Sequence, residues 1–212
     1  MKETTKKILD ELIERYPKLS NVKGDILDTY LVLESAYKNG NKVLVCGNGG
    51  SMSDSEHIVG ELLKRFKKDR EIPLDVKEKL MAMGEEGKEV ASTLEGSLPA
   101  ISLGSHNALT SAFANDRNPL MGYAQQVMGL GNSGDVLIAI STSGNSKNCT
   151  YAVLTALAKG LKVVLLTGKT GGKLKDLADV SIIAPEEETY KIQELHLPIY
   201  HALCAMLEEE FF

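Results

Sequence analysis

The sequence predicts an α/β protein built on a doubly wound, five-stranded parallel sheet. Five short apolar runs, rich in β-branched residues, occupy positions 42–46, 100–103, 136–140, 163–166 and 180–184. Each run is continuously apolar instead of alternating, which is typical of a strand buried on both faces of a parallel sheet. Helical patterns lie between the runs, and this alternation of strand and helix defines the doubly wound class.

Length and composition indicate a single domain over residues 1–212. The chain is 43% hydrophobic and 25% charged, which is enough apolar material for a core and too much for disorder. With 24 basic and 29 acidic side chains the net charge is −5. Direct binding of nucleic acid is therefore not expected, because that affinity comes from clustered Lys and Arg.

The same composition argues against a membrane or secreted protein. No apolar run reaches the roughly 18 residues of a membrane span, and residues 1–16 lack the apolar stretch of a secretory signal. The three cysteines, Cys46, Cys149 and Cys204, form no CxxC pair. They predict a reduced, cytoplasmic protein with buried thiols.

Two amphipathic helices are expected in residues 1–40, before the first strand. Apolar side chains recur at helical spacing within 2–16 and 26–38, and Asn39-Gly40-Asn41 ends the second helix. Two such helices present more apolar surface than one sheet readily covers. We therefore expect a homo-oligomer, most simply a tetramer, buried through these helices.

Further helices are expected at 146–159 and, at the C-terminus, over roughly 189–210. In the last helix Pro198 removes the hydrogen bond to the Glu194 carbonyl, which predicts a local kink. Residues 67–95 do not fit the alternation of strand and helix. They are charge-rich with apolar side chains at helical spacing, and they predict an inserted helical segment.

A glycine-rich loop, Cys46-Gly-Asn-Gly-Gly-Ser51, joins the first strand to a helix. Its glycines let the backbone approach a ligand, and the helix N-terminus offers free N–H groups to an anion. A dinucleotide fingerprint would need glycine where Met52 stands, and the acidic residue expected about 20 positions later is missing. A Walker loop ending at Gly172-Lys173 would need glycine in place of Thr167. No nucleotide cofactor is expected, and a tight turn without ligand remains the alternative.

A second loop, Ile140-Ser-Thr-Ser-Gly-Asn-Ser146, also joins a buried strand to a helix. Its four hydroxyls surround a glycine where the helix dipole favours an anion, which suits a sugar phosphate. They belong to Ser141, Thr142, Ser143 and Ser146. Simple N-capping of the helix is the alternative, although capping needs only one such side chain.

His57 and Glu61 lie four residues apart on the helix after the first loop and so share one face. An imidazole and a carboxylate at this spacing form half of a metal site, although an exposed surface pair is the plainer interpretation. Gln193, His196 and His201 on the last helix are further candidates.

Together these motifs resemble the sugar isomerase (SIS) domain and, within it, the phosphoheptose isomerase family. The resemblance covers almost the whole chain, and the motifs occur in the same order along the sequence as in the family. They are Cys46-Gly-Asn-Gly-Gly-Ser51, His57 with Glu61, Asn115-Asp116, Gly134-Asp-Val-Leu137, Ser141-Thr-Ser-Gly-Asn-Ser146, Leu166-Thr-Gly-Lys169 and Ile192-Gln-Glu-Leu-His196 through His201.

The resemblance implies a flavodoxin-like sheet, a homotetramer with shared active sites, and isomerisation between sedoheptulose 7-phosphate and D-glycero-D-manno-heptose 7-phosphate. It also implies one zinc ion per subunit, held by His57, Glu61, Gln193 and His201. The implied substrate contacts are Asn48, Gly49, Gly50, Ser51, Asn115, Asp116, Ser141, Thr142, Ser143, Ser146 and Gln193.

Aldose–ketose isomerisation needs a base for a proton next to the carbonyl and an acid that moves a proton on oxygen. Glu61 is the candidate base and His201 the candidate acid. Metal coordination would weaken Glu61 as a base, so the two roles compete. The chain departs from the family in the long segment 67–95 and in Tyr190, where the family carries Asp, which bears on the choice of sugar.

Two other functions stay open at this point. A relative of these isomerases that associates with a bacterial replication initiator is a tetrameric scaffold without catalysis, and it lacks the glutamate and the last-helix histidine that this chain has. A sensor that binds a sugar phosphate without turnover is the third possibility.

Overall fold

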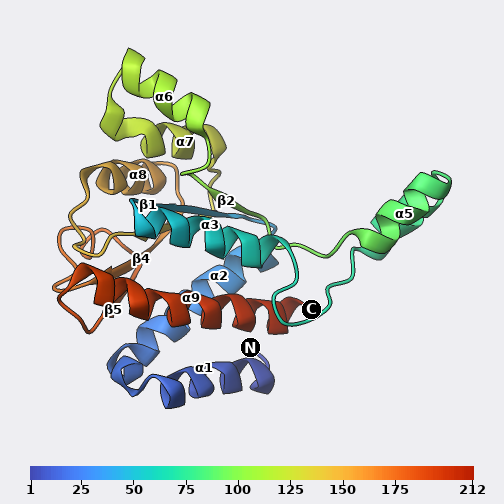
Figure 1. Ribbon diagram of the computed structural model, residues 1–212, viewed down its shortest axis with the longest axis horizontal. Coiled ribbons are helices and arrows are strands. Elements are labelled where there is room, and N and C mark those ends of the chain that lie inside the picture. The colour runs from blue at the N-terminus through green and yellow to red at the C-terminus, as the bar shows by residue number, and fades with distance from the viewer.

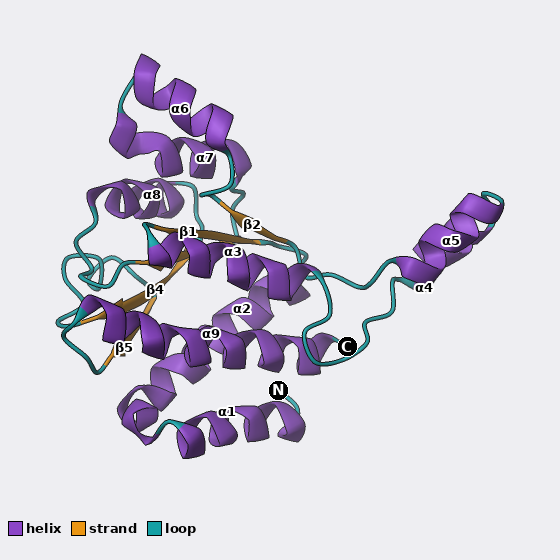
Figure 2. Cartoon of the chain, in the orientation of Figure 1, coloured by secondary structure: helices purple, strands orange, loops and turns teal.

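A computed structural model describes all residues from 1 to 212 and shows one five-stranded parallel sheet (Figures 1 and 2). The strands are β1 (Val43–Gly47), β2 (Ala100–Ser102), β3 (Val136–Ile140), β4 (Lys162–Gly168) and β5 (Val180–Ala184). Their order is β2-β1-β3-β4-β5, so the winding reverses between β1 and β3. The predicted α/β class and the five strands are confirmed, with differences of at most two residues at the ends.

Two apolar layers sandwich the sheet, and consecutive strand residues point into opposite layers. Val43 and Val45 of β1 pack with helices α2 (Lys23–Lys38), α3 (Gly50–Leu63) and α9 (Thr189–Phe211). Leu44 and Cys46 pack with α7 (Gly122–Leu130) and α8 (Lys147–Ala158) on the other face. Both faces of the strands are therefore buried, which explains why their sequences are continuously apolar.

The N-terminal helices cover their own chain. Helix α1 (Glu3–Arg15) packs along α9, and a 3-10 turn, η1 (Pro17–Val22), leads into α2. Leu9 and Leu12 of α1 and Ile26 of α2 belong to the core of the chain itself. Much of the apolar surface that suggested an interface between subunits is thus buried within one subunit, whereas Leu31 of α2 is 43% exposed.

The C-terminal helix α9 continues through Pro198 without interruption from Thr189 to Phe211. Three elements between β2 and β3 were not predicted by position: α6 (Asn107–Asp116), the 3-10 turn η2 (Pro119–Met121) and α7. None of the helices combines the length and hydropathy that crossing a membrane requires.

The inserted segment forms a hairpin arm of two helices, α4 (Leu74–Met81) and α5 (Glu85–Thr93), which projects away from the body (Figure 1). At its root, Gly96 N donates to Arg70 O at 2.9 Å and Leu98 N donates to Leu62 O at 2.9 Å. The arm carries large apolar side chains in solvent, among them Leu74, Met81, Met83, Val90 and Leu94. An isolated pair of helices this short is marginally stable, so this surface is suited to being covered.

Candidate active site

Both predicted ligand loops leave the carboxyl ends of neighbouring strands. The glycine loop follows β1 and the hydroxyl loop follows β3, on either side of the point where the strand order reverses. In open α/β sheets this switch point is the place where ligands bind. The N-termini of α3 and α8 meet there, and both helix dipoles favour an anion.

The glycine loop is fixed by its backbone conformation and by a pair of amides. Gly49 has φ +57°, a left-handed conformation that residues with a Cβ rarely adopt. Asn48 Nδ2 donates to Asn148 Oδ1 at 2.9 Å, and Asn148 Nδ2 returns a bond to Asn48 Oδ1 at 2.7 Å. The loop is therefore tied to the first turn of α8. In addition, the Tyr123 hydroxyl donates to the Gly47 carbonyl.

The hydroxyl loop is not built for helix capping. Ser146 stands at the N-cap of α8, yet its side chain makes no capping hydrogen bond, and of the first turn Cys149 N donates to Asn148 Oδ1 at 3.0 Å. The Ser146 hydroxyl instead lies 2.9 Å from the hydroxyl of Ser141, and Ser143 Oγ accepts from Asn145 N at 3.3 Å. The capping alternative therefore does not explain Ser146, and the open N-terminus of α8 fits the anion interpretation.

Helices α3 and α9 lie side by side and run in the same direction. Gln193 contacts Gly50 at their N-terminal ends, where a Cβ on Gly50 would lie 2.7 Å from Gln193 Nε2. Further along, His201 faces His57. At the C-terminal end Glu208 accepts from Phe66 N, just beyond α3, at 2.8 Å. Gln193, His201 and Glu208 of α9 thus each have a counterpart on or just beyond α3.

Three of the four predicted metal ligands converge between these helices. His57 Nε2 lies 3.2 Å from Glu61 Oε1 and 3.4 Å from His201 Nε2. Glu61 Oε2 is buried without a hydrogen-bond partner. Burial lowers the pKa of His201, His57 lowers it further and Glu61 opposes the shift, so this imidazole is neutral at pH 7. The cluster combines a carboxylate with a neutral imidazole, the two groups that proton transfer needs.

The donor set fits zinc in chemistry, and two separations within it have the length that zinc ligands require. Ligand atoms about 2.0–2.1 Å from a tetrahedral zinc ion lie about 3.3 Å from one another. The two measured separations around His57 Nε2 match that value. In the present side-chain positions, however, no three His, Cys, Asp or Glu residues are arranged to hold an ion together. Gln193 lies two helical turns before His201 and contacts the glycine loop instead.

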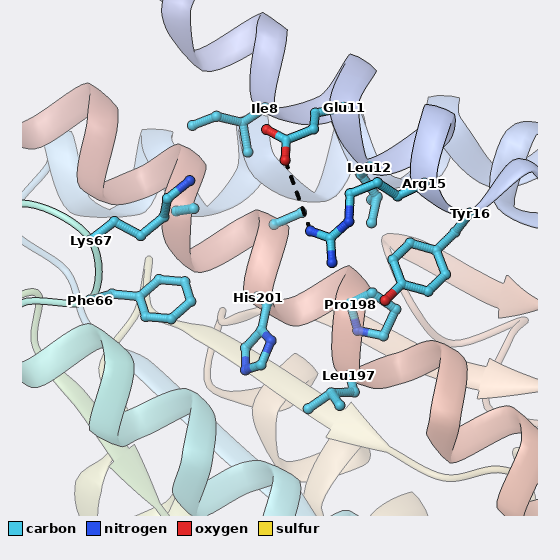
Figure 3. Close-up of a pocket in the computed structure, with 12 residues that line it drawn as sticks. Ile8, Glu11, Leu12, Arg15, Tyr16, Phe66, Lys67, Leu197, Pro198 and His201 are labelled. Atoms are coloured by element: carbon cyan, nitrogen blue, oxygen red, sulfur yellow. Dashed lines mark ion pairs between the residues drawn. The ribbon is translucent and has the colours of Figure 1, made fainter.

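A groove opens onto His201 from the side of α1 (Figure 3). It encloses about 290 Å³ between α1, α9 and the chain just after α3. Phe66 and Pro198 form apolar walls, and the ion pair of Arg15 with Glu11 at 3.9 Å lies at the α1 side. His201, the candidate acid, can therefore be reached through this groove from the side of α1, away from the point where the strand order reverses.

The other predicted residues do not join the cluster. Asn115 and Asp116 lie exposed at the end of α6, where Asn115 Nδ2 donates to Asp116 Oδ1 at 2.8 Å. Helix α6 borders a cleft of about 280 Å³ that Asn48 and Asn148 also line. His196 is fully buried, and its Nε2 lies 3.0 Å from Thr167 O, so this candidate belongs to the core. Tyr190, at the start of α9, is 55% exposed.

Two side chains that sequence reasoning missed contact the cluster. The Tyr200 hydroxyl lies 3.0 Å from His57 Nδ1 and donates to Asp54 Oδ1 at 3.3 Å. Burial raises the pKa of Asp54, and the bond from Tyr200 opposes the shift. Asp54 precedes His57 by three residues on one helix face, a spacing that could have drawn attention to it.

The fold and the two loops define the class: this is a SIS-domain protein. The SIS domain model matches residues 118–208, from η2 to α9. The phosphoheptose isomerase of Nitratiruptor is 40% identical over 181 residues, covering 85% of this chain and 83% of that protein. The phosphoheptose isomerase of Helicobacter pylori strain P12 is 37% identical over 210 residues, covering 99% and 91%.

Solved structures agree with these relatives. The phosphoheptose isomerase structure from Neisseria gonorrhoeae is 28% identical with a TM-score of 0.74, covering 94% of both chains. That from Francisella tularensis is 29% identical with a TM-score of 0.74, covering 99% of this chain and 100% of that one. The chain belongs to the phosphoheptose isomerase family.

Proposed function

We propose that this chain is an aldose–ketose isomerase that interconverts sedoheptulose 7-phosphate and D-glycero-D-manno-heptose 7-phosphate. The observation that carries the proposal is the meeting of Glu61, His57 and His201 between two helices whose N-terminal ends meet the ligand loops. The family relatives are named for this activity. A non-catalytic SIS module would need the loops alone, so the complete cluster favours the enzyme.

The layout suits a substrate with a phosphate at one end and a carbonyl at the other. The phosphate would lie in the hydroxyl loop, against Ser141, Thr142, Ser143 and Ser146 and the α8 N-terminus. From the helix rise, Gly50 and His57 are separated by about 10 Å along α3. An extended heptose 7-phosphate has a similar length from C1 to its phosphorus, and would bring C1 and C2 to the cluster. The glycine loop and Gln193 would contact the hydroxyls between.

The chemistry divides between the two oxygens of Glu61 and the imidazole of His201. Glu61 Oε2, which is buried without a hydrogen bond and lies 3.7 Å from Lys64 Nζ, takes the proton from C1 of the ketose and returns it to C2. His201 donates a proton to the carbonyl oxygen and removes one from the neighbouring hydroxyl. A neutral imidazole can do both, because one nitrogen carries a proton and the other accepts one.

We also propose a zinc ion at the cluster, one per chain. His57, Glu61 and His201 would hold it, and Gln193 would join by reorienting its amide. When bound, the ion would polarise the substrate carbonyl as a Lewis acid. Glu61 would face it with Oε1, which already points to His57, leaving Oε2 for the proton.

The assembly and location are further parts of the proposal. We infer a homo-oligomer, most simply a tetramer, and the exposed apolar side chains of the arm support association. We infer a cytoplasmic location, and the three free, buried cysteines support a reducing compartment.

Isomerisation of sedoheptulose 7-phosphate in D₂O tests the function. Wild-type protein should form the aldose and incorporate solvent deuterium, observed by proton NMR, because an enediol exchanges its carbon-bound proton through Glu61. The Glu61→Gln variant should lose about 10²–10⁴-fold in rate. Glu56→Gln, an exposed carboxylate on the same helix, is the matched control. Turnover by Glu61→Gln near the wild-type rate would contradict the mechanism.

A further inference from the structure

Consecutive residues of α9 engage both ring nitrogens of His57. The Tyr200 hydroxyl lies 3.0 Å from Nδ1, and His201 Nε2 lies 3.4 Å from Nε2. The Tyr200 side chain is 2% exposed and stands edge-on to both imidazoles. Phenylalanine would supply the same ring contacts, so the hydroxyl is the part of Tyr200 that packing does not explain.

The hydroxyl has a second partner that sets the direction of its hydrogen bond. Tyr200 donates to Asp54 Oδ1 at 3.3 Å. An ionised carboxylate only accepts, so the single hydroxyl proton of Tyr200 is used in this bond. The tyrosine oxygen then presents a lone pair to His57 Nδ1, and Nδ1 must carry the imidazole proton.

A proton on Nδ1 leaves Nε2 of neutral His57 with its lone pair. That lone pair points to the side of the ring where Glu61 Oε1 lies at 3.2 Å and His201 Nε2 at 3.4 Å. Asp54 Oδ2 is buried and has no hydrogen-bond partner. The carboxylate is therefore retained beside Tyr200 with half of its hydrogen-bonding capacity unused, which a purely structural role does not account for.

We propose that Asp54 and Tyr200 are positioning residues that hold His57 in the tautomer protonated on Nδ1, so that Nε2 keeps its electron pair for a metal ion held jointly with Glu61 and His201. This inference rests on the proposed function, since it explains how His57 is kept ready to coordinate a metal. Without the hydrogen bonds that link Asp54, Tyr200 and His57, the single proton of the neutral imidazole is free to move to Nε2. A proton on Nε2 occupies the electron pair that would bind a metal ion, and Nε2 then becomes a hydrogen-bond donor toward Glu61 and His201.

Two variants change the hydrogen bonds between Asp54, Tyr200 and His57 in different ways. Tyr200→Phe removes the hydroxyl and keeps the ring. Asp54→Ala removes the acceptor of the Tyr200 hydroxyl, so the hydroxyl proton is free to turn to His57 Nδ1 and the tautomer reverses. Tyr30→Phe is the matched control, because Tyr30 is also buried and bonded to a carboxylate, Glu34, at 3.1 Å.

The first measurement is the tautomer of His57 in metal-free protein, from ¹⁵N–¹H correlation spectra at a pH where the imidazole is neutral, assigned with His57→Ala. We expect the proton on Nδ1 in wild type and Tyr30→Phe, and on Nε2 in Asp54→Ala and Tyr200→Phe. The second is Zn²⁺ affinity by competition with a chelator. The Asp54 and Tyr200 variants should each bind Zn²⁺ about 10–100-fold more weakly than wild type, and Tyr30→Phe should bind it as wild type does.

The same tautomer in wild type and Asp54→Ala would overturn the inference, as would Tyr200→Phe binding zinc within twofold of wild type. Circular dichroism shows whether either variant is misfolded, and the other then carries the test. Isomerase activity separates the two proposals. An active wild type with no change of tautomer refutes only the positioning role, whereas a tautomer reversal in a protein that does not isomerise heptose phosphate refutes only the proposed function.

Discussion

Glu208→Gln should destabilise the protein by about 4 kcal/mol, because it breaks a buried ion pair and its hydrogen bonds. Glu208 Oε1 accepts from Phe66 N and from Arg70 Nε, both at 2.8 Å, and Oε2 accepts from Lys67 N at 2.7 Å and Lys68 N at 3.2 Å. A glutamine amide replaces one oxygen with a donor, so in either orientation two N–H groups lose their acceptor. Each buried unsatisfied donor costs about 1–3 kcal/mol.

The loss of the buried charge on Glu208 leads to the same estimate for the decrease in the free energy of unfolding. The Arg70 and Glu208 side chains are 0% and 1% exposed, and removing one partner of such a pair typically costs about 3–5 kcal/mol. Urea unfolding followed by circular dichroism measures the loss. Glu209→Gln on the same helix is the control, because its bond to Lys68 lies at the surface and is worth less than about 1 kcal/mol. A loss below 1 kcal/mol in Glu208→Gln would refute the reasoning.

The pair also predicts a pH effect. Burial by itself raises the pKa of Glu208, but the bonds from Phe66, Lys67 and Arg70 outweigh it and hold the pKa below the ordinary value of 4.5. A carboxyl group with a lowered folded pKa stabilises the protein above its unfolded pKa, and this stability is lost as pH falls through the folded pKa. The Glu208→Gln variant should therefore lose less stability than wild type between pH 5 and pH 3.

Three other outcomes follow from the structure. Protein purified without chelator should contain about one divalent ion per chain by elemental analysis, and His57→Ala should lose it; full isomerase activity in EDTA would contradict the metal site. Burial lowers the pKa of His196 from 6.5 to about 4, so its protonation favours the unfolded state below pH 6.5. Between pH 7 and pH 5 wild type should lose about 2 kcal/mol more stability than His196→Gln, and equal losses would contradict the burial argument. Replacing residues 74–94 by a short Gly/Ser linker should reduce the oligomer mass in light scattering, whereas an unchanged mass would show that assembly does not use the arm.

The sheet could be predicted from the sequence because its signal is local. Each strand is a continuous apolar run between turn residues, and both faces of each are covered. The loops after β1 and β3 could be predicted for the same reason, since each directly follows a strand. The helices α6 and α7 were harder to locate, because α6 has no buried residues and thus no apolar stripe with helical periodicity.

The arm shows a different limit. Its helical pattern was visible in the sequence, but its placement was not, because it depends on Arg70, whose partners include Glu208, 138 residues away. Arg70 Nη1 donates to Leu62 O and Arg70 Nη2 to Glu61 O, both at 2.8 Å. With the Glu208 bond, these contacts tie the start of the arm to the C-terminal ends of α3 and α9.

The site could be predicted in part because His57 and Glu61 share one helix, where spacing fixes which side chains are neighbours. Across two helices the sequence offers no such rule. His196, Tyr200 and His201 all lie on α9, and only the crossing with α3 decides which of them reaches His57. Since the helices run in parallel with Gly50 beside Gln193, the residue facing His57 must come seven or eight positions later on α9. That condition selects Tyr200 and His201, and it leaves His196 to the core beneath.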